Sequence, residues 1–397
     1  MNKRIIVLIS VILLFSNCVT SKYKQKGFVT NKEYSKEISF EYINGFIFIP
    51  VTIENKEYKF LLDTGAELNL IDPKIANQLN LKPLKKGTIS NAKESEKRIS
   101  RVEISNINIG GIDFHQTAGI IWDISKFSDL IGCVKIDGLI GNNLMRKSNW
   151  QINYQNKTIK ISDKIDNFNI SSNVKKTIMN SGNYGNVIFD VTIRDKTKRF
   201  TFDTGFNGFM QTGETDILEN EKYLTQIGLT GANFNGKKDG ETYYNKLETF
   251  SLNGIEFKSP KLLSVKTNSS SVLGNEFYEN FILTIDWQND LLYFDPQKNI
   301  EFIEPALFEV SIYADYGKNE ILVSSIYKES KLLKEIKPHS KVLFINDIDV
   351  SSFKKDELCD FWDNEWTNLK KLDELNITVS LEENTQKLTI KKIKNEW

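Results

Sequence analysis

Histidine and cysteine are scarce in this chain, whose 397 residues include two histidines and three cysteines. His115 and His339 are far apart in the sequence, and the cysteines do not have the spacing of a metal-binding motif. A zinc centre and a Ser-His or Cys-His catalytic pair are therefore poorly supported. We interpret both histidines as ordinary surface or core residues, and we expect neither a metal nor another cofactor.

An excess of charge of either sign is also missing, since 52 lysines and arginines balance 52 aspartates and glutamates. No block of basic residues is dense enough to indicate a nucleic-acid partner. The length is too great for one hydrophobic core and suits about three domains.

The N-terminus carries only a short hydrophobic run, from Ile5 to Phe15, after Lys3 and Arg4. Such a run is too short to span a bilayer as a mature helix, so it predicts a secretory signal. The segment Leu14-Phe15-Ser16-Asn17-Cys18 resembles the lipobox of bacterial lipoproteins, with Phe15 and Asn17 as its less usual residues.

The resemblance implies that residues 1–18 form a lipoprotein signal and that Cys18 becomes the lipidated first residue. Ordinary cleavage and an uncleaved anchor are the alternatives. We therefore expect a lipid-anchored protein of the bacterial cell envelope, facing the periplasm or the exterior.

The other two cysteines of the chain are Cys133 and Cys359. An oxidising compartment permits a disulfide between them, but two distant cysteines are weak support for one.

One tripeptide occurs twice, as Asp63-Thr64-Gly65 and Asp203-Thr204-Gly205, each time at the end of an apolar run. A shift of 140 residues also places Val51-Thr52-Ile53 on Val191-Thr192-Ile193, and a shift of 133 places Gly141-Asn142 on Gly274-Asn275. Features that recur in one order indicate two lobes of common ancestry.

Two neighbouring carboxylates can activate water without a metal or a thiolate. Like charges a few ångströms apart share one proton, so one carboxylate accepts a proton from water while the other hydrogen-bonds the scissile carbonyl. We therefore predict Asp63 and Asp203 as catalytic residues. Thr64 and Thr204 would bond across to the opposing loop, and Gly65 and Gly205 would let backbone amides approach the carboxylates.

These residues resemble the pepsin and retroviral-protease superfamily of aspartic peptidases. The segment 60–66 (Phe-Leu-Leu-Asp-Thr-Gly-Ala) is similar to the retropepsin signature, and segments 137–144 and 271–275 are similar to the apolar-Gly segments behind the active loops. The resemblance covers residues 38–300 and implies a mostly β, bilobal fold with an interlobe cleft that binds a peptide or protein substrate. The alternative is an inactive relative that binds peptides or scaffolds a partner through its cleft and its C-terminal domain.

Two features depart from that pattern. Phe206 follows the second Asp-Thr-Gly where a small residue is usual. In the first half, residues 93–98 look like a solvated loop where a flap hairpin is expected. In the second half, Gly231, Gly236 and Gly240 precede Tyr243-Tyr244 and predict either a flap or an ordinary surface loop.

The expected organisation is a flexible tether at 19–36, two lobes at 37–166 and 167–304, and a third domain at 305–397. Alternating apolar residues predict strands over 46–53 and 58–62, with counterparts at 187–193 and 199–202, and a helix over 73–79.

The segment 331–350 resembles a PDZ domain, with His339-Ser340 in place of the usual Gly-Asp and Asp347 in place of Gly. A second helix is expected over 356–372. A PDZ fold implies peptide capture by strand addition. The carboxylate-binding loop would lie at 314–317, which lacks the usual glycines, so a structural or interdomain role is an equal alternative.

Overall fold

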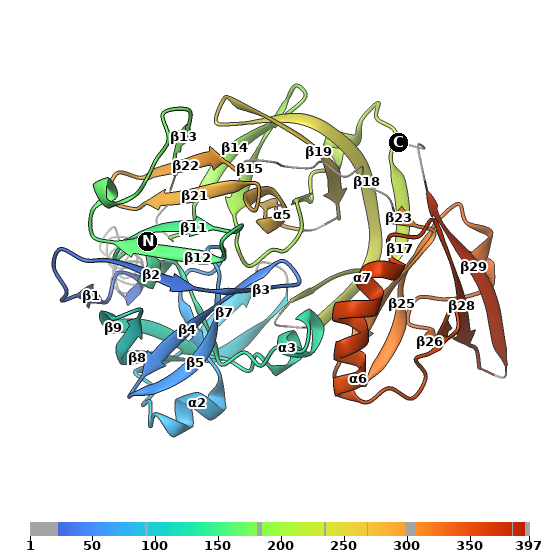
Figure 1. Cartoon of the computed structure of the whole chain (residues 1–397), viewed down its shortest axis with the longest axis horizontal. Coiled ribbons are helices and arrows are strands. Elements are labelled where there is room, and N and C mark those ends of the chain that lie inside the picture. Colours follow the sequence, from blue (N-terminus) through green and yellow to red (C-terminus); the bar gives the residue numbers. More distant parts are fainter. Residues whose placement is uncertain are drawn as a thin grey trace, which may run out of the picture.

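The computed structural model describes residues 23–91, 94–180, 185–233, 236–267, 269–297, 307–382 and 384–393. The predicted signal and Cys18 lie outside these residues. The described chain is mostly β, as expected, and has three parts: a first lobe that carries Asp63, a second lobe that carries Asp203, and a C-terminal region, residues 307–393 (Figure 1). No described helix is long and apolar enough to cross a membrane.

The first lobe is built on a sheet in the order β1-β9-β6-β10-β5-β4-β8-β7, with β3 added to β4. Its strands are β1 Phe28–Val29, β3 Glu41–Ile43, β4 Phe46–Ile53, β5 Lys56–Leu62, β6 Asn69–Ile71, β7 Lys85–Asn91, β8 Glu94–Ile109, β9 Ile112–Ile121 and β10 Gly138–Ile140.

A second sheet joins the two lobes, in the order β13-β22-β21-β11-β12-β2. The junction is the antiparallel pair of β11 and β21, in which Trp150 is opposite Ile285. The strands are β2 Ser35–Ser39, β11 Asn149–Asn153, β12 Thr158–Ser162, β13 Lys175–Ile178, β21 Phe281–Asp286 and β22 Leu291–Pro296.

The third sheet continues from the second lobe into the C-terminal region, because β17 of the lobe pairs with β25 of that region. Its strands in the lobe are β14 Ile188–Ile193, β15 Lys196–Phe202, β16 Met210–Thr212, β17 Leu224–Asn233, β18 Gly236–Leu252, β19 Ile255–Val265 and β20 Val272–Leu273. The C-terminal strands are β23 Leu307–Phe308, β24 Val310–Asp315, β25 Glu320–Tyr327, β26 Lys341–Ile345, β27 Ile348–Asp349, β28 Glu374–Ser380 and β29 Thr385–Ile393.

The described helices are short. The α-helices are α2 Pro73–Gln78, α3 Ser125–Ile131, α4 Asn142–Met145, α5 Asn275–Tyr278, α6 Lys355–Asp360 and α7 Trp366–Leu369. The 3₁₀ turns are η1 Ile165–Asn167, η2 Thr215–Leu218 and η3 Lys331–Lys334. A π-helical turn, η4 Phe361–Glu365, joins α6 to α7, so the helix expected over 356–372 runs from 355 to 369.

The strand expected over 46–53 forms with those bounds as β4. The next strand begins two residues earlier than expected, at Lys56, because the turn consists of Glu54 and Asn55 alone. Both turn residues have positive φ, 50° and 61°, which matches the twist of a tight hairpin.

Residues 23–36 correct the expectation of a flexible tether. The Tyr23 hydroxyl donates to the carbonyl oxygens of Val102 and Gly119, and Tyr34 is buried and hydrogen-bonds Ser148. Polar composition suggested a tether, but two aromatic side chains and the backbone of β2 attach this segment to the first lobe. Residues 19–22 lie outside the described part.

The two lobes share one hydrophobic core, and the C-terminal region has another. One large cluster of buried side chains extends through both lobes and includes Trp150, Phe202 and Tyr278. A separate cluster in the C-terminal region includes Val323 and Leu358. Since burial of apolar area is the main favourable contribution to folding, the two lobes are stabilised together, and the C-terminal region has a core of its own.

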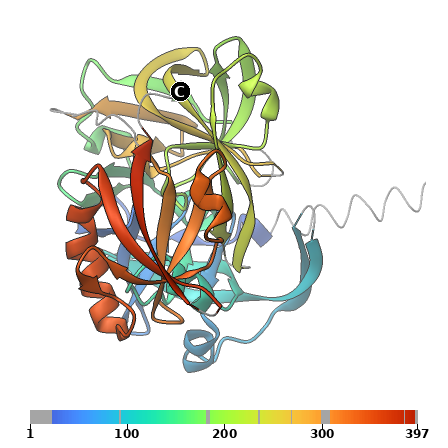
Figure 2. The ribbon, with the colours of Figure 1, turned by 90° about the vertical axis from the view of Figure 1, so that its right-hand side faces the viewer.

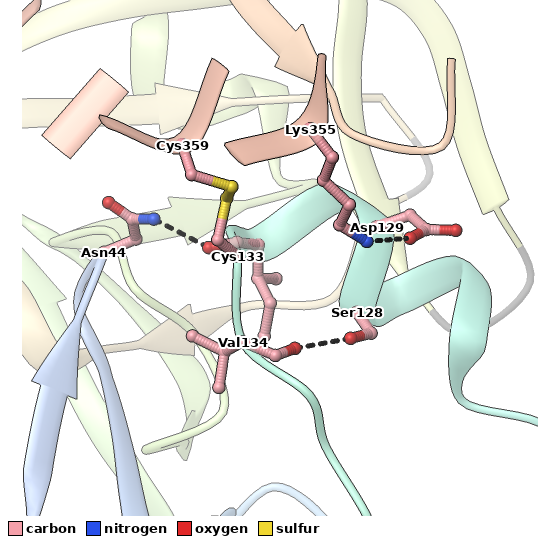
Figure 3. The surroundings of a disulfide bond; sticks show 8 residues. Asn44, Ser128, Asp129, Cys133, Val134, Lys355 and Cys359 are labelled. Carbon is pink, nitrogen blue, oxygen red and sulfur yellow. Dashed lines mark hydrogen bonds and ion pairs between the residues drawn. A yellow bond between two sulfur atoms is a disulfide. The ribbon is translucent and has the colours of Figure 1, made fainter. Parts of the chain in front are cut away.

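A disulfide between Cys133 and Cys359 ties the C-terminal region to the first lobe. Cys133 follows α3 and Cys359 lies in α6, so the bond joins the segment after α3 to α6, as Figure 3 shows. Asn44 donates to the Ile131 carbonyl beside it, and Lys355 of α6 forms an ion pair with Asp129 of α3 at 3.6 Å. The first lobe is thus cross-linked to the region, whereas the second lobe is joined to it by strand pairing.

Candidate active site

Each Asp-Thr-Gly tripeptide begins where a buried strand ends. The side chains of Phe60 and Leu62 in β5, and of Phe200 and Phe202 in β15, are fully buried. Alternating aromatic and aliphatic residues of this kind form a strand that packs one face in the core. The chain leaves each strand at its aspartate, so the core fixes the position of both tripeptides.

The two threonines hydrogen-bond the opposite loop in the same way. The Thr64 backbone N–H donates to Thr204 Oγ1 at 3.0 Å, and the Thr204 N–H donates to Thr64 Oγ1 at 2.9 Å. Each hydroxyl then donates to a strand end across the interface, Thr64 to the Phe202 carbonyl and Thr204 to the Leu62 carbonyl, both at 2.9 Å. Four bonds among fully buried groups therefore hold the loops face to face.

The two glycines allow the carboxyl groups to meet. A Cβ atom on Gly65 would collide with the carboxyl of Asp203, and one on Gly205 would collide with the carboxyl of Asp63. The Asp63 and Asp203 side chains also hydrogen-bond each other. The structure thus brings together all six residues that the sequence singles out in the two tripeptides.

The carboxyls differ in their backbone partners. Asp63 Oδ1 accepts from the N–H groups of Gly65 at 2.8 Å and Ala66 at 3.1 Å. Among the described backbone groups, the Asp203 carboxyl accepts from the Gly205 N–H alone, at 2.9 Å. Amide donors stabilise a carboxylate, so Asp63 is the better placed to carry the negative charge.

Burial raises the pKa of both carboxyls above the ordinary range of aspartate. The increase is larger for Asp203, where burial is the main cause and the neighbouring charge of Asp63 adds to it. At Asp63 the hydrogen bonds from Asp203 and from two backbone amides oppose burial. The arrangement therefore favours one shared proton, held mainly on Asp203, with Asp63 ionised.

A matching scaffold lies behind each loop. Strand β10 pairs in parallel with β5, and β20 pairs in parallel with β15. At the ends of these strands Asn142 Nδ2 donates to the Thr64 carbonyl at 2.6 Å, and Asn275 Nδ2 donates to the Thr204 carbonyl at 2.7 Å. The two asparagines come from the Gly-Asn repeat, which signalled duplication in the sequence but not this supporting role.

The hairpins differ from the expected flaps. Residues 94–98, expected in a solvated loop, belong to β8 and pair with β7. Backbone hydrogen bonds form whatever the polarity of the side chains, so the charged composition misled the prediction. This hairpin projects from the body of the molecule, as Figure 2 shows.

The second hairpin, β17–β18, contains the glycines proposed for a flap, but it is not an ordinary surface loop. Gln226 in β17 pairs with Tyr327 of the C-terminal region, and along β18 Asp239 bonds His339 while Lys237 forms an ion pair with Asp315 at 2.5 Å. No motif in the sequence predicts that this hairpin is held along its length by another part of the chain.

Within the described ranges, no three His, Cys, Asp or Glu side chains gather as metal ligands would. The titratable groups at the meeting point of the two loops are the carboxyls of Asp63 and Asp203.

Comparison with protein-family models identifies residues 49–144 as similar to a family described as aspartyl protease. The matched segment covers about a quarter of the chain and contains Asp63, β10 and Asn142. The comparison with curated proteins found no match. The family match supports a protease-like function, and the second tripeptide lies outside it.

Proposed function

We propose that this protein is an aspartic endopeptidase in which Asp63 and Asp203 form the catalytic dyad. The observation that carries the proposal is the contact between the two carboxyls, held by reciprocal threonine bonds from both lobes. The family match in the first lobe supports the same class of activity.

In the proposed reaction, Asp63 accepts a proton from a water molecule that attacks the scissile carbonyl carbon. Asp203 donates its proton to the carbonyl oxygen, which yields a neutral tetrahedral diol. Transfer of a proton to the amide nitrogen then accompanies cleavage of the C–N bond and leaves a carboxylic acid and an amine. Every proton in this reaction moves between the dyad, the water molecule and the substrate, so the proposed steps need no cofactor.

Cleavage of an unfolded protein tests the activity, with a statine-type transition-state analogue as inhibitor. A competent dyad binds such a mimic far more tightly than a substrate. Cleavage that the analogue abolishes supports the proposal. Binding of peptides without cleavage would instead favour the alternative of a peptide-binding or scaffolding protein.

We also propose that the chain is attached to the envelope through Cys18 and divides into lobes at 37–166 and 167–304 and a PDZ-like domain at 305–397. A disulfide persists in oxidising compartments, so the Cys133–Cys359 bond supports a location outside the cytoplasm. Cys18→Ser should move the protein from the membrane to the soluble envelope fraction. Unchanged membrane association would favour another anchor.

A further inference from the structure

A cavity of about 360 Å³ lies where the two lobes and the C-terminal region meet. The first lobe lines it with Phe46, Phe127 and Ile131, and the C-terminal region with Tyr316 and Trp362. Its volume is at the lower end of the range for ligand pockets, which suits one or two side chains of a larger ligand.

The cavity is continuous with the loop that carries Asp203. Asn207 lines it and donates through Nδ2 to the Asn44 carbonyl at 3.0 Å. The adjacent Gly45 carbonyl accepts from Asn275, whose side chain also supports the Thr204 carbonyl. One hydrogen-bonded framework therefore forms the wall of the cavity and the back of the candidate active site.

The chemistry of the lining selects an uncharged, largely apolar group. None of the described residues that line the cavity is charged. The Tyr316 hydroxyl is buried and has no hydrogen-bond partner among the described residues. Burial also raises the pKa of Tyr316, so the hydroxyl stays neutral and can donate. A buried, unpartnered hydroxyl costs free energy that a bound ligand would recover.

The contacts around the cavity disfavour capture of a free C-terminus. In a PDZ-like domain the carboxylate would bind at 314–317, but the Tyr316 N–H already donates to the Asp129 carbonyl of the first lobe. Gly317 also lies beside the Asp129 carboxylate, which would repel a second negative charge. The Cys133–Cys359 disulfide holds this arrangement in place.

We propose that this cavity is a substrate subsite that binds a large apolar or aromatic side chain of the peptide in the cleft. The C-terminal region thus supplies part of the specificity of the peptidase, with Trp362 as a wall of the subsite and the Tyr316 hydroxyl as a donor to the substrate. This inference rests on the proposed peptidase function. It assigns the C-terminal region to substrate selection near the dyad.

The test is to map cleavage sites in a mixture of peptides with full-length wild-type protein and with Trp362→Ala and Tyr316→Phe. The matched control is Phe344→Ala, which removes an exposed aromatic side chain of the same region. Wild-type protein should prefer a large apolar residue at one fixed position from the cleaved bond. Trp362→Ala should lower kcat/KM at least about tenfold for such peptides and little for peptides with alanine there.

Tyr316→Phe keeps the shape of the side chain and should lower kcat/KM by about two- to tenfold. It remains informative if Trp362→Ala does not fold. Phe344→Ala should behave as wild type. If wild-type protein cleaves and all variants keep one identical preference, the subsite is overturned while the peptidase stands. If wild-type protein cleaves no peptide, the proposed function fails, and the subsite fails with it.

Discussion

The two lobes share the frame of the candidate site but differ in the details that set charge and mobility. Both loops have the threonine bonds and a supporting asparagine, with spacings that differ by 0.1 Å between equivalent pairs. However, Asp63 accepts from two backbone amides and Asp203 from one. The two lobes thus share the groups that position the carboxyls and differ in the backbone donors that set the charge of each carboxyl.

The hairpins show the same divergence. In the first lobe β7–β8 projects from the body of the molecule, whereas β17–β18 in the second lobe is joined to the C-terminal region. Local opening costs more free energy for a hairpin that is held by ion pairs and strand pairing than for a hairpin that projects into solvent. We therefore expect β17–β18 to open less readily than β7–β8.

The largest effect should follow from removal of either carboxylate. Asp63→Asn and Asp203→Asn should each lower peptidase activity roughly a thousandfold or more, because general acid and general base act in one step. The exposed Asp166→Asn is the control and should be fully active. Measured kcat/KM in both variants, with circular dichroism to verify the fold, checks this. Appreciable activity in either variant would contradict a shared dyad.

The second-largest effect should follow from loss of the disulfide that links the first lobe to the C-terminal region. Cys133→Ser/Cys359→Ser should reduce the free energy of unfolding by about 2–4 kcal/mol, toward the upper end because 226 residues separate the cysteines. Denaturant unfolding with and without reductant measures it. Reductant should lower the midpoint of the wild type and leave the double variant unchanged. Equal midpoints in all four samples would mean that strand pairing alone holds the region.

Removal of the reciprocal threonine hydrogen bonds should have a smaller effect on stability. Thr64→Val and Thr204→Val should each cost about 2–3 kcal/mol, because each leaves a buried N–H of the other loop without an acceptor. Thr64→Ser keeps the hydroxyl and should cost less. The double variant should cost less than the sum, since both singles break one network. Strictly additive losses in urea unfolding would show that the bonds act independently.

The residues that sequence reasoning located are those with a local signature. Asp-Thr-Gly is recognised as a short motif that occurs twice in the sequence. The hairpin around Glu54-Asn55 is recognised from the alternating apolar residues on either side of it. Both features depend on neighbours along the chain, so one sequence suffices to predict them. The supporting asparagines were visible as a repeat, although their role depends on contacts with a carbonyl more than 70 residues away.

What the sequence left open depends on contacts between distant parts. Cys133 and Cys359 gave weak support for a bond, because only the folded chain brings the segment after α3 next to α6. Tyr23 and Tyr34 looked like part of a polar tether until partners far along the chain were known. Likewise, nothing near Tyr316 in the sequence shows that this residue lines a cavity or that its buried hydroxyl has no partner among the described residues.

The smallest predicted effect tests the charge difference between the lobes. Burial raises the pKa of both carboxyls, so the singly protonated dyad persists to higher pH, and we expect greatest activity at roughly pH 5–7. A hydroxyl at position 206 would donate to Asp203 and stabilise its anion. Stabilising the anion lowers the pKa of Asp203, which holds the shared proton, so Phe206→Ser should shift the basic limb of the kcat/KM profile down by about one pH unit. Ala66→Ser acts on the ionised Asp63 and should shift the acidic limb down by less, because Asp63 already accepts from two amides. Peptide cleavage between pH 2 and 9 measures both shifts, and an equal or larger shift in Ala66→Ser would show that the two carboxyls are equivalent.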